Sequence, residues 1–202
     1  MTIDTENLLE SILESLERFD HIKADDIPNM DLYMDQVTTL MEENLAQASR
    51  HGDEDKILTK TMINNYAKND LLPAPNKKKY SKEHILVLVL IYYFKGILSI
   101  GDIQRLLQPL NEHFFANEGG LKIEDIYNEV FSMENSQMKV LKQDVVEKYK
   151  LAQEQFGEAP EEHQKFLKKF AFICALSFDV YVKKLIIEKM IDDLPEANPK
   201  KK

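Results

Sequence analysis

The stretch ILTKTMINNYAKNDLLPAPNKKKYSKEHILVLVLIYYFKGILSIGDIQRLL, residues 57–107, decides the fold. It predicts a short polar helix, a turn rich in proline and lysine, a strongly apolar helix and a short closing helix. Residues 56–83 hold seven lysines against Asp70 and Glu83, so this segment carries a charge of +5 while the whole chain carries −9. A local reversal of sign of that size points to an anionic partner.

The polar helix has one face without carboxylates. Thr59 is a suitable N-cap, because its hydroxyl can accept a hydrogen bond from a free amide of the first turn. The helical spacing turns apolar side chains such as Ile63 and Tyr66 away from this face. Amides and a cation can read base edges and contact phosphates in a DNA major groove, although a solvated helix face has the same composition. The residues of this face are Thr61, Asn64, Asn65 and Lys68.

A basic turn follows the polar helix. Pro73 and Pro75 end the helix, because each proline disfavours helical dihedrals in the residue before it. Three consecutive lysines then precede Ser81, a suitable N-cap for the apolar helix. On so short a connection, these lysines are expected to lie beside a phosphate backbone when the preceding helix enters the groove, with Lys60 assisting. The three are Lys77, Lys78 and Lys79.

Three segments resemble the DNA-binding domain of MerR-type regulators, namely residues 62–73, 79–83 and 99–103. The resemblance covers residues 27–108 and implies a winged helix-turn-helix, with a recognition helix over 60–69 and a basic wing over 76–80. The chain also resembles a family of uncharacterised bacterial proteins of about this length with a MerR-like N-terminal domain. Asn64 stands where MerR relatives usually have an arginine, and Asp70 stands where they have a turn glycine.

The remaining sequence predicts further helices, so the expected fold class is all-α. The helix over 81–95 is apolar on nearly every side and must be covered by a second layer. Ser99 and Asp102 resemble a capping box for a closing helix that ends at Pro109. The predicted parts, in chain order, are an N-terminal amphipathic helix within 1–26, the helix-turn-helix domain at 27–108, a linker at 109–122, a dimerising or regulatory helical hairpin at 123–194 and a disordered tail at 195–202.

Within these parts the expected helices run over 5–19, 32–48, 123–156 and 161–194, with a charged loop at 49–56. The helix at 161–194 is expected to turn an apolar stripe inward. Its lone Cys174 is interpreted as a packed thiol in a reducing compartment. The expected inward residues are Phe166, Phe170, Ile173, Cys174, Ser177, Tyr181 and Leu185.

The sequence lacks the patterns of several other classes of protein. It has no glycine-rich phosphate loop, and its five histidines and single cysteine show no metal-ligand spacing. We therefore expect no enzyme activity, no cofactor and no metal site. The longest apolar run, residues 85–94, is too short to span a membrane, and the N-terminus lacks the pattern of a signal peptide, so the expected location is cytoplasmic.

The sequence leaves two hypotheses for function. The first is a DNA-binding transcriptional regulator, expected to be a homodimer that binds double-stranded DNA through Lys60, Thr61, Asn64, Asn65, Lys68, Lys77, Lys78 and Lys79. The second is an all-α module that has kept a helix-turn-helix shape but binds another protein. The charge of −9 favours the second hypothesis, and the local charge of +5 favours the first.

Overall fold

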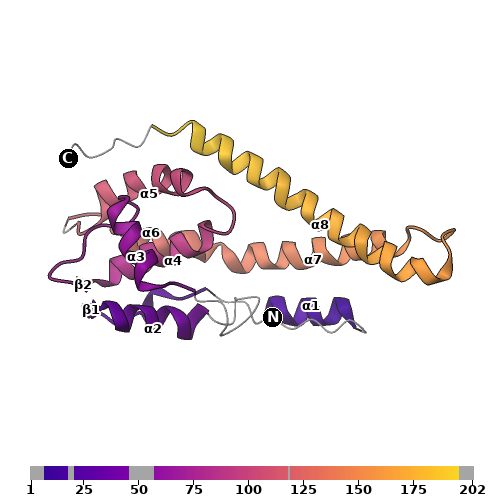
Figure 1. The fold of residues 1–202 in the computed structure, drawn as a ribbon, viewed down its shortest axis with the longest axis horizontal. Coiled ribbons are helices and arrows are strands. Elements are labelled where there is room, and N and C mark those ends of the chain that lie inside the picture. Colours follow the sequence, from indigo (N-terminus) through magenta and orange to yellow (C-terminus); the bar gives the residue numbers. More distant parts are fainter. Residues whose placement is uncertain (1–6, 18–20, 46–56, 118, 196–202) are drawn as a thin grey trace. The chain divides into compact units, whose positions relative to one another are not determined.

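The computed structural model describes residues 7–17, 21–45, 57–117 and 119–195. These residues are mostly helical and hold one two-stranded sheet, so the all-α class is confirmed (Figure 1). The elements are α1 (Leu8–Glu17), a short 3₁₀ helix (Ala24–Asp26), β1 (Leu32–Tyr33), α2 (Met34–Leu45), α3 (Lys60–Lys68), β2 (Lys79–Tyr80), α4 (Lys82–Phe94), α5 (Ile100–Phe114), α6 (Ile123–Ser132), α7 (Glu134–Gln153) and α8 (Glu161–Asp192).

The chain divides into two compact units. Unit 1 contains the described parts of residues 20–132 and 188–202, and unit 2 contains the described parts of 2–19 and 133–187. The loop expected at 49–56 and the tail expected after residue 195 lie outside the described residues. None of the described helices combines the length and the apolar character that a membrane span needs.

Helix α4 is the centre of unit 1. Its apolar residues surround the whole helix, and its buried positions are consecutive from His84 to Val89, followed by Ile91. Helix α6 contacts α4, and the Nζ atom of Lys82 lies 2.7 Å from the Oε1 atom of Glu124 on α6. The prediction that this helix must be covered on every side is therefore confirmed, and α6 supplies part of the cover.

Helices α3 and α5 begin at the predicted caps. Thr59 Oγ1 accepts a hydrogen bond of 3.2 Å from the backbone N–H of Met62 at the start of α3. Ser99 Oγ accepts from the backbone N–H of Asp102, and Asp102 Oδ2 accepts from the backbone N–H of Ser99, which completes a capping box on α5. These contacts fix where α3 and α5 begin, and both predictions are confirmed.

Helix α5 continues beyond the predicted end at Pro109. It reaches Phe114, so the first half of the predicted linker at 109–122 is helical. Proline inside a helix removes one backbone donor and crowds the carbonyl four residues earlier, so contacts elsewhere must offset its cost. The side chain of Asn111, two residues farther on, donates a 3.1 Å hydrogen bond to the carbonyl oxygen of Leu71 and secures this part of α5.

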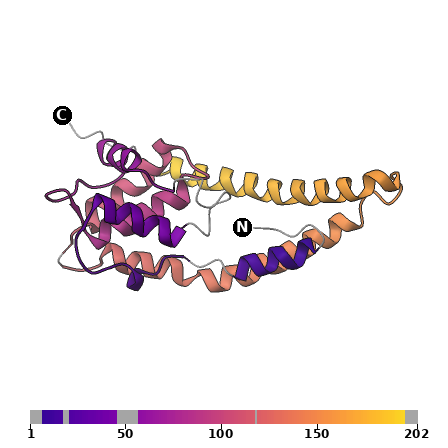
Figure 2. The same ribbon diagram turned by 60° about the horizontal axis from the view of Figure 1, so that its bottom comes forward.

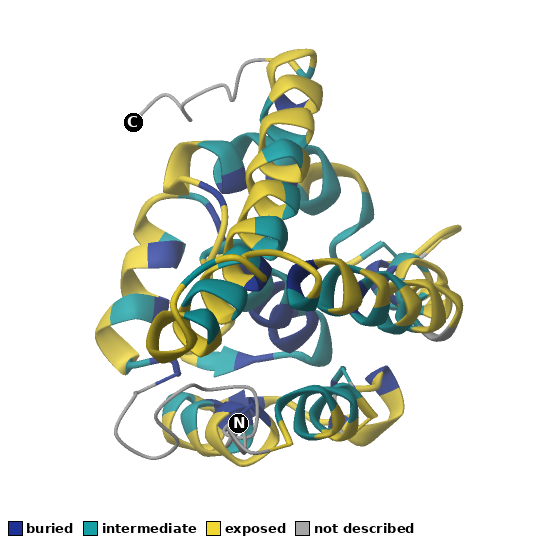
Figure 3. Ribbon diagram, turned by 90° about the vertical axis from the view of Figure 1, so that its right-hand side faces the viewer, coloured by how far each residue is buried: buried dark blue, intermediate teal, exposed yellow. Residues whose placement is uncertain are grey.

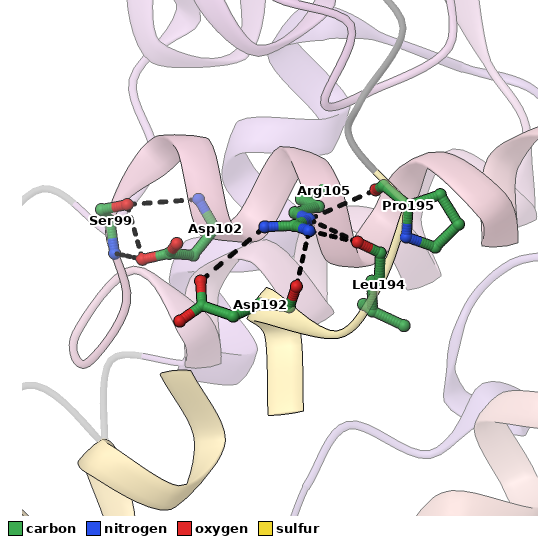
Figure 4. A network of polar contacts seen from close by, with 6 residues as sticks. All are labelled: Ser99, Asp102, Arg105, Asp192, Leu194 and Pro195. Carbon is green, nitrogen blue, oxygen red and sulfur yellow. Dashed lines mark hydrogen bonds and ion pairs between the residues drawn. The ribbon is translucent and has the colours of Figure 1, made fainter. Parts of the chain in front are cut away.

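Arg105 attaches α5 to the C-terminal end of α8 within unit 1. Its Nε donates to the carbonyl oxygen of Leu194 at 2.9 Å and its Nη2 to the carbonyl oxygen of Asp192 at 2.8 Å (Figure 4). Its Nη1 lies 3.7 Å from Oδ1 of Asp192. The guanidinium thus satisfies carbonyls that the end of a helix leaves without partners.

The helix predicted over 123–156 is two helices, because the chain turns at Met133 between α6 and α7. Helix α6 belongs to unit 1, where Tyr127 is fully buried and its hydroxyl donates a 2.5 Å hydrogen bond to the carbonyl oxygen of Ile22. Helix α7 belongs to unit 2. The apolar stripe predicted for 123–156 is interrupted at Glu134, where α7 begins, but it resumes beyond that residue, so the pattern predicted one helix.

Unit 2 packs α1, α7 and α8 around a small core (Figures 1 and 2). Val145 and Ala152 on α7 pack with Phe172 on α8, and Leu9, Ile12 and Leu16 of α1 pack against this cluster. The Nζ atom of Lys148 on α7 lies 2.8 Å from Oδ2 of Asp179 on α8. The face of α8 that points inward is therefore the face that carries Ala171, Phe172 and Leu176.

The prediction that this stripe of α8 points inward is wrong. Its residues are exposed, as is Cys174, so this thiol is not packed as predicted (Figure 3). The cause is that α8 is apolar on two faces, and α1 and α7 cover only one of them. The exposed residues are Phe166, Phe170, Ile173, Cys174, Ser177, Tyr181 and Leu185.

His84 is a buried polar residue of unit 1 and caps α4. Its Nδ1 accepts hydrogen bonds from the backbone N–H of Ser81 at 3.0 Å and from the Ser81 hydroxyl at 2.8 Å, so the neutral ring carries its proton on Nε2. The ring also contacts Tyr80 and Phe115, with centroids 5.5 and 4.7 Å away. Burial lowers the pKa of His84 below its ordinary value of 6.5, and nearby carbonyls and Asp31 oppose only part of that shift.

We predict that His84 makes the stability of the chain depend on pH. Because its pKa is lower in the folded state, its contribution is fully present above about pH 6.5 and is lost as pH falls through the folded-state pKa. The free energy of unfolding should therefore decrease between pH 7 and pH 5 in urea titrations followed by circular dichroism. His84→Gln keeps a capping side chain but does not titrate, so this variant should show a shallower dependence. Equal slopes for the two proteins would contradict the prediction.

Candidate nucleic-acid interface

The predicted polar face of α3 is exposed. Ile63 and Tyr66 are buried, and burial raises the pKa of the Tyr66 hydroxyl. Their burial fixes the rotation of α3 about its own axis, so the opposite side of the helix faces solvent. The residues on that side are Thr61, Asn64, Asn65 and Lys68, all exposed, with Lys60 exposed at the first helical position.

The end of α3 is shaped by Asp70. Its φ of 55° lies in the left-handed region, and the backbone N–H of Leu71 donates a 2.9 Å hydrogen bond to the carbonyl oxygen of Tyr66. This is the pattern of a Schellman motif, which usually places glycine at the Asp70 position. Leu71 and Leu72 then enter the core, so the chain leaves α3 in a fixed direction toward the basic segment.

The basic segment forms a tight hairpin turn. Asn76 and Lys79 pair as a β-bridge, and the backbone N–H of Lys79 donates to the carbonyl oxygen of Asn76 at 2.9 Å. Lys77 and Lys78 occupy the two central positions with φ of 48° and 64°. Two positive φ angles in a two-residue hairpin loop define a type I′ turn, which asparagine and glycine normally occupy. The turn therefore places two exposed lysines at its tip, in a backbone conformation that lysine disfavours.

Strand β1 holds this turn in place. β1 pairs antiparallel with β2, with Leu32 opposite Tyr80 and Tyr33 opposite Lys79. Lys79 is half-buried, and its Nζ lies 5.1 Å from the centre of the Tyr33 ring. Helix α2 contacts both α3 and β2, so it supports both parts of the candidate interface.

Two residues of this region were not among the predicted site residues, and Tyr33 lies exposed in β1 although the sequence predicted it on the inner face of a helix over 32–48. Tyr33 supplies the ring beneath Lys79, and Asp35 on α2 forms an ion pair with Lys60. A strand of two residues has no periodicity that a sequence could show. Both side chains of the Lys60–Asp35 pair are well exposed, so solvent screens the pair strongly.

The eight predicted site residues thus fall into three groups. Four share the exposed face of α3, and two form the tip of the hairpin turn. Lys60 and Lys79 are exposed or half-exposed but already contact side chains of the same chain. Within the described residues, no cluster of three or more histidine, cysteine or acidic side chains is arranged to hold a metal ion.

Comparison with known proteins gives one match. A family profile described as "Domain of unknown function (DUF1836)" matches residues 22–130, which is just over half of the chain. The matched residues contain α2, α3, the hairpin turn, α4, α5 and nearly all of α6. No curated protein and no solved structure matches the chain.

We predict that the Lys77→Asn/Lys78→Gly variant stabilises the fold. Each lysine in a left-handed conformation costs about 1–2 kcal/mol, and Asn-Gly adopts a type I′ turn readily. Relief at two positions gives about 2–4 kcal/mol, and the greater freedom of glycine in the unfolded chain offsets about 1 kcal/mol of it. The free energy of unfolding should therefore rise by about 1–3 kcal/mol in urea titrations. Lys77→Ala/Lys78→Ala removes the same charges but keeps both Cβ atoms, so this control should show no comparable gain. A gain of the same size in both variants would assign the effect to charge instead of backbone strain.

Proposed function

The chain belongs to the family described as a domain of unknown function, DUF1836, and we propose that it is a DNA-binding transcriptional regulator with a MerR-like winged helix-turn-helix in unit 1. In this proposal α3 is the recognition helix and enters the major groove. The hairpin turn before β2 is the wing and lies against the phosphate backbone. The bacterial cytoplasm is the compartment in which such a regulator would act.

The observation that carries the proposal is the composition of the exposed face of α3. This face presents a hydroxyl, two amides and an ammonium group, and it contains no carboxylate. An asparagine amide can pair with the N6 and N7 atoms of adenine through two hydrogen bonds. Because the N-cap at Thr59 and the buried Ile63 and Tyr66 fix the helix, Asn64 and Asn65 are held at the surface before DNA arrives.

The hairpin turn supports the same function. A segment that only connected β2 to α3 would be more stable with asparagine and glycine at positions 77 and 78. Backbone strain of this kind concentrates at functional sites. Two strained lysines with exposed ammonium groups are therefore more consistent with binding to an anion than with a purely structural turn. Lys79 follows these two lysines and Lys60 begins α3, and both add to the local charge of +5.

A second function, binding of another protein, is favoured by specific contacts. Asp35 pairs with Lys60, and Tyr33 lies beneath Lys79, so two of the eight predicted residues are already engaged within the chain. The rest of the chain is acidic and would repel DNA. We place this function second because neither contact involves the amides of α3 or the two lysines at the tip of the turn.

We predict that DNA binding depends on the lysines of the turn. Filter binding on a library of genomic fragments should detect complexes whose affinity falls with salt. Lys77→Asn/Lys78→Gly should weaken binding and reduce the slope of log K against log [salt] by about 2, because each phosphate contact contributes about 0.9. Lys139→Gln/Lys150→Gln removes two exposed charges from α7 and should leave the slope unchanged. Absence of any bound fragment, or equal slopes for both variants, would reject the proposal.

We predict that the asparagines of α3 determine sequence preference. Asn64→Ala and Asn65→Ala should each reduce the preference for a selected duplex over a scrambled one by about 1–3 kcal/mol, the value of a good base contact. The salt dependence should not change, because neither side chain is charged. Asn128→Ala, an exposed asparagine on α6, is the matched control and should keep full preference. Loss of affinity without loss of preference would show that these amides contact only the backbone of DNA.

A further inference from the structure

We propose that Asp35 limits the affinity of the chain for DNA, because its carboxylate competes with a phosphate group of the duplex for the ammonium group of Lys60. Asp35 was not among the predicted site residues. It lies in the first turn of α2, and it forms an ion pair with Lys60, the first residue of α3. This inference rests on the proposed function, and it adds a residue that weakens DNA binding to those that support it.

The ion pair borders the candidate nucleic-acid interface. Helix α2 contacts α3, and residues 60, 64 and 68 recur at a spacing of four residues, which places Lys60 on the same side of α3 as Asn64 and Lys68. The exposed face of α3 contains no carboxylate of its own. Asp35 therefore brings a negative charge from a neighbouring helix to the edge of a face that is otherwise suited to an anion.

A phosphate group can replace the Asp35 carboxylate chemically. Both are anions with several acceptor oxygens, and the ammonium group of Lys60 can donate hydrogen bonds to either. The N-terminal end of a helix disfavours a cation and favours an anion. Lys60 places a cation at this end of α3, so a negative group beside it is favourable. Asp35 provides that group in the free chain, and DNA would provide it in the complex.

Exposure to solvent keeps the pair weak enough to exchange partners. The Lys60 side chain is 61% exposed and the Asp35 side chain is 75% exposed, so a duplex can reach both. Exposed ion pairs shift an equilibrium by about fivefold or less. Binding of DNA through Lys60 must nevertheless separate the pair, and the released carboxylate then lies near the phosphates, where like charges repel. Both effects lower the affinity for DNA.

The contact between Tyr33 and Lys79 has the opposite electrostatic consequence. Tyr33 precedes Asp35 by two residues, and the centre of its ring lies 5.1 Å from Nζ of Lys79. An aromatic ring attracts an ammonium group without cancelling its charge. Lys79 therefore keeps its charge for a phosphate, whereas the charge of Lys60 is balanced by Asp35. One short segment, residues 33–35, thus holds two lysines of the candidate interface but neutralises only Lys60 of these two.

The salt dependence of DNA binding by the full chain tests the proposal. The probe is a fluorescent duplex with the sequence of a genomic fragment that the wild type binds in the filter assay. Asp35→Asn should bind this duplex about two- to fivefold more tightly at low salt and steepen the slope of log K against log [salt] by about 1, because Lys60 gains a phosphate contact. Glu42→Gln is the matched control. It removes the same charge from an exposed position of α2 roughly 10 Å farther along the helix, and it should leave the slope unchanged.

A double variant assigns the effect to Lys60. In Lys60→Gln/Asp35→Asn no lysine is released, so the slope should return to the wild-type value. Asp35→Asn should also keep the wild-type preference for the selected duplex over a scrambled one, because phosphate contacts carry no sequence information. Equal slopes for Asp35→Asn and Glu42→Gln, a steeper slope that persists in the double variant, or a changed preference would overturn this inference while DNA binding stands. A wild type that binds no fragment would reject the proposed function itself, and this inference with it.

Discussion

The burial of α4 is the constraint on which the structure of unit 1 depends. A helix that is apolar on every side cannot remain at a surface, so the surrounding elements must cover it from several directions. Helix α6 and strand β2 both contact it, and the Lys82–Glu124 ion pair joins it to α6. His84 extends the same core to the base of the hairpin turn through its contacts with Tyr80 and Ser81. The position of the basic turn is therefore coupled to the packing of the core.

At the tip of that turn, the residues that would best stabilise the backbone differ from the charged residues that the sequence places there. The backbone there favours residues with little side chain, whereas the sequence places two long cations in it. Strand β1 and the ring of Tyr33 compensate in part, because they hold Lys79 and the second strand of the turn. Asp70 at the end of α3 is a milder example, since aspartate tolerates positive φ better than most residues do. Both positions lie in the segment whose charge has the opposite sign to that of the chain.

The sequence was sufficient where a pattern was local. The spacing of Ile63 and Tyr66 predicted which side of α3 faces solvent, and Thr59 and Ser99 marked the starts of their helices. Features that depend on contacts between distant parts of the chain could not be predicted from such local patterns. The two-residue strand at Leu32 and Tyr33 is too short to have a period. Helix α5 continues past Pro109 and is held by the hydrogen bond from Asn111 to Leu71, a contact that no local pattern predicts. The inward side of α8 was assigned wrongly, because a helix with two apolar faces does not reveal which one its neighbours cover.

The contacts of Arg105 stabilise the C-terminal end of α8. Most of this helix belongs to unit 2, but its final residues belong to unit 1. There the guanidinium of Arg105 on α5 donates hydrogen bonds to the carbonyl oxygens of Asp192 and Leu194. A positive group at this end also interacts favourably with the negative C-terminal end of the helix dipole, so the last turn is protected from fraying. Loss of the guanidinium would leave these carbonyl oxygens without partners, so α8 would begin to unwind from this end.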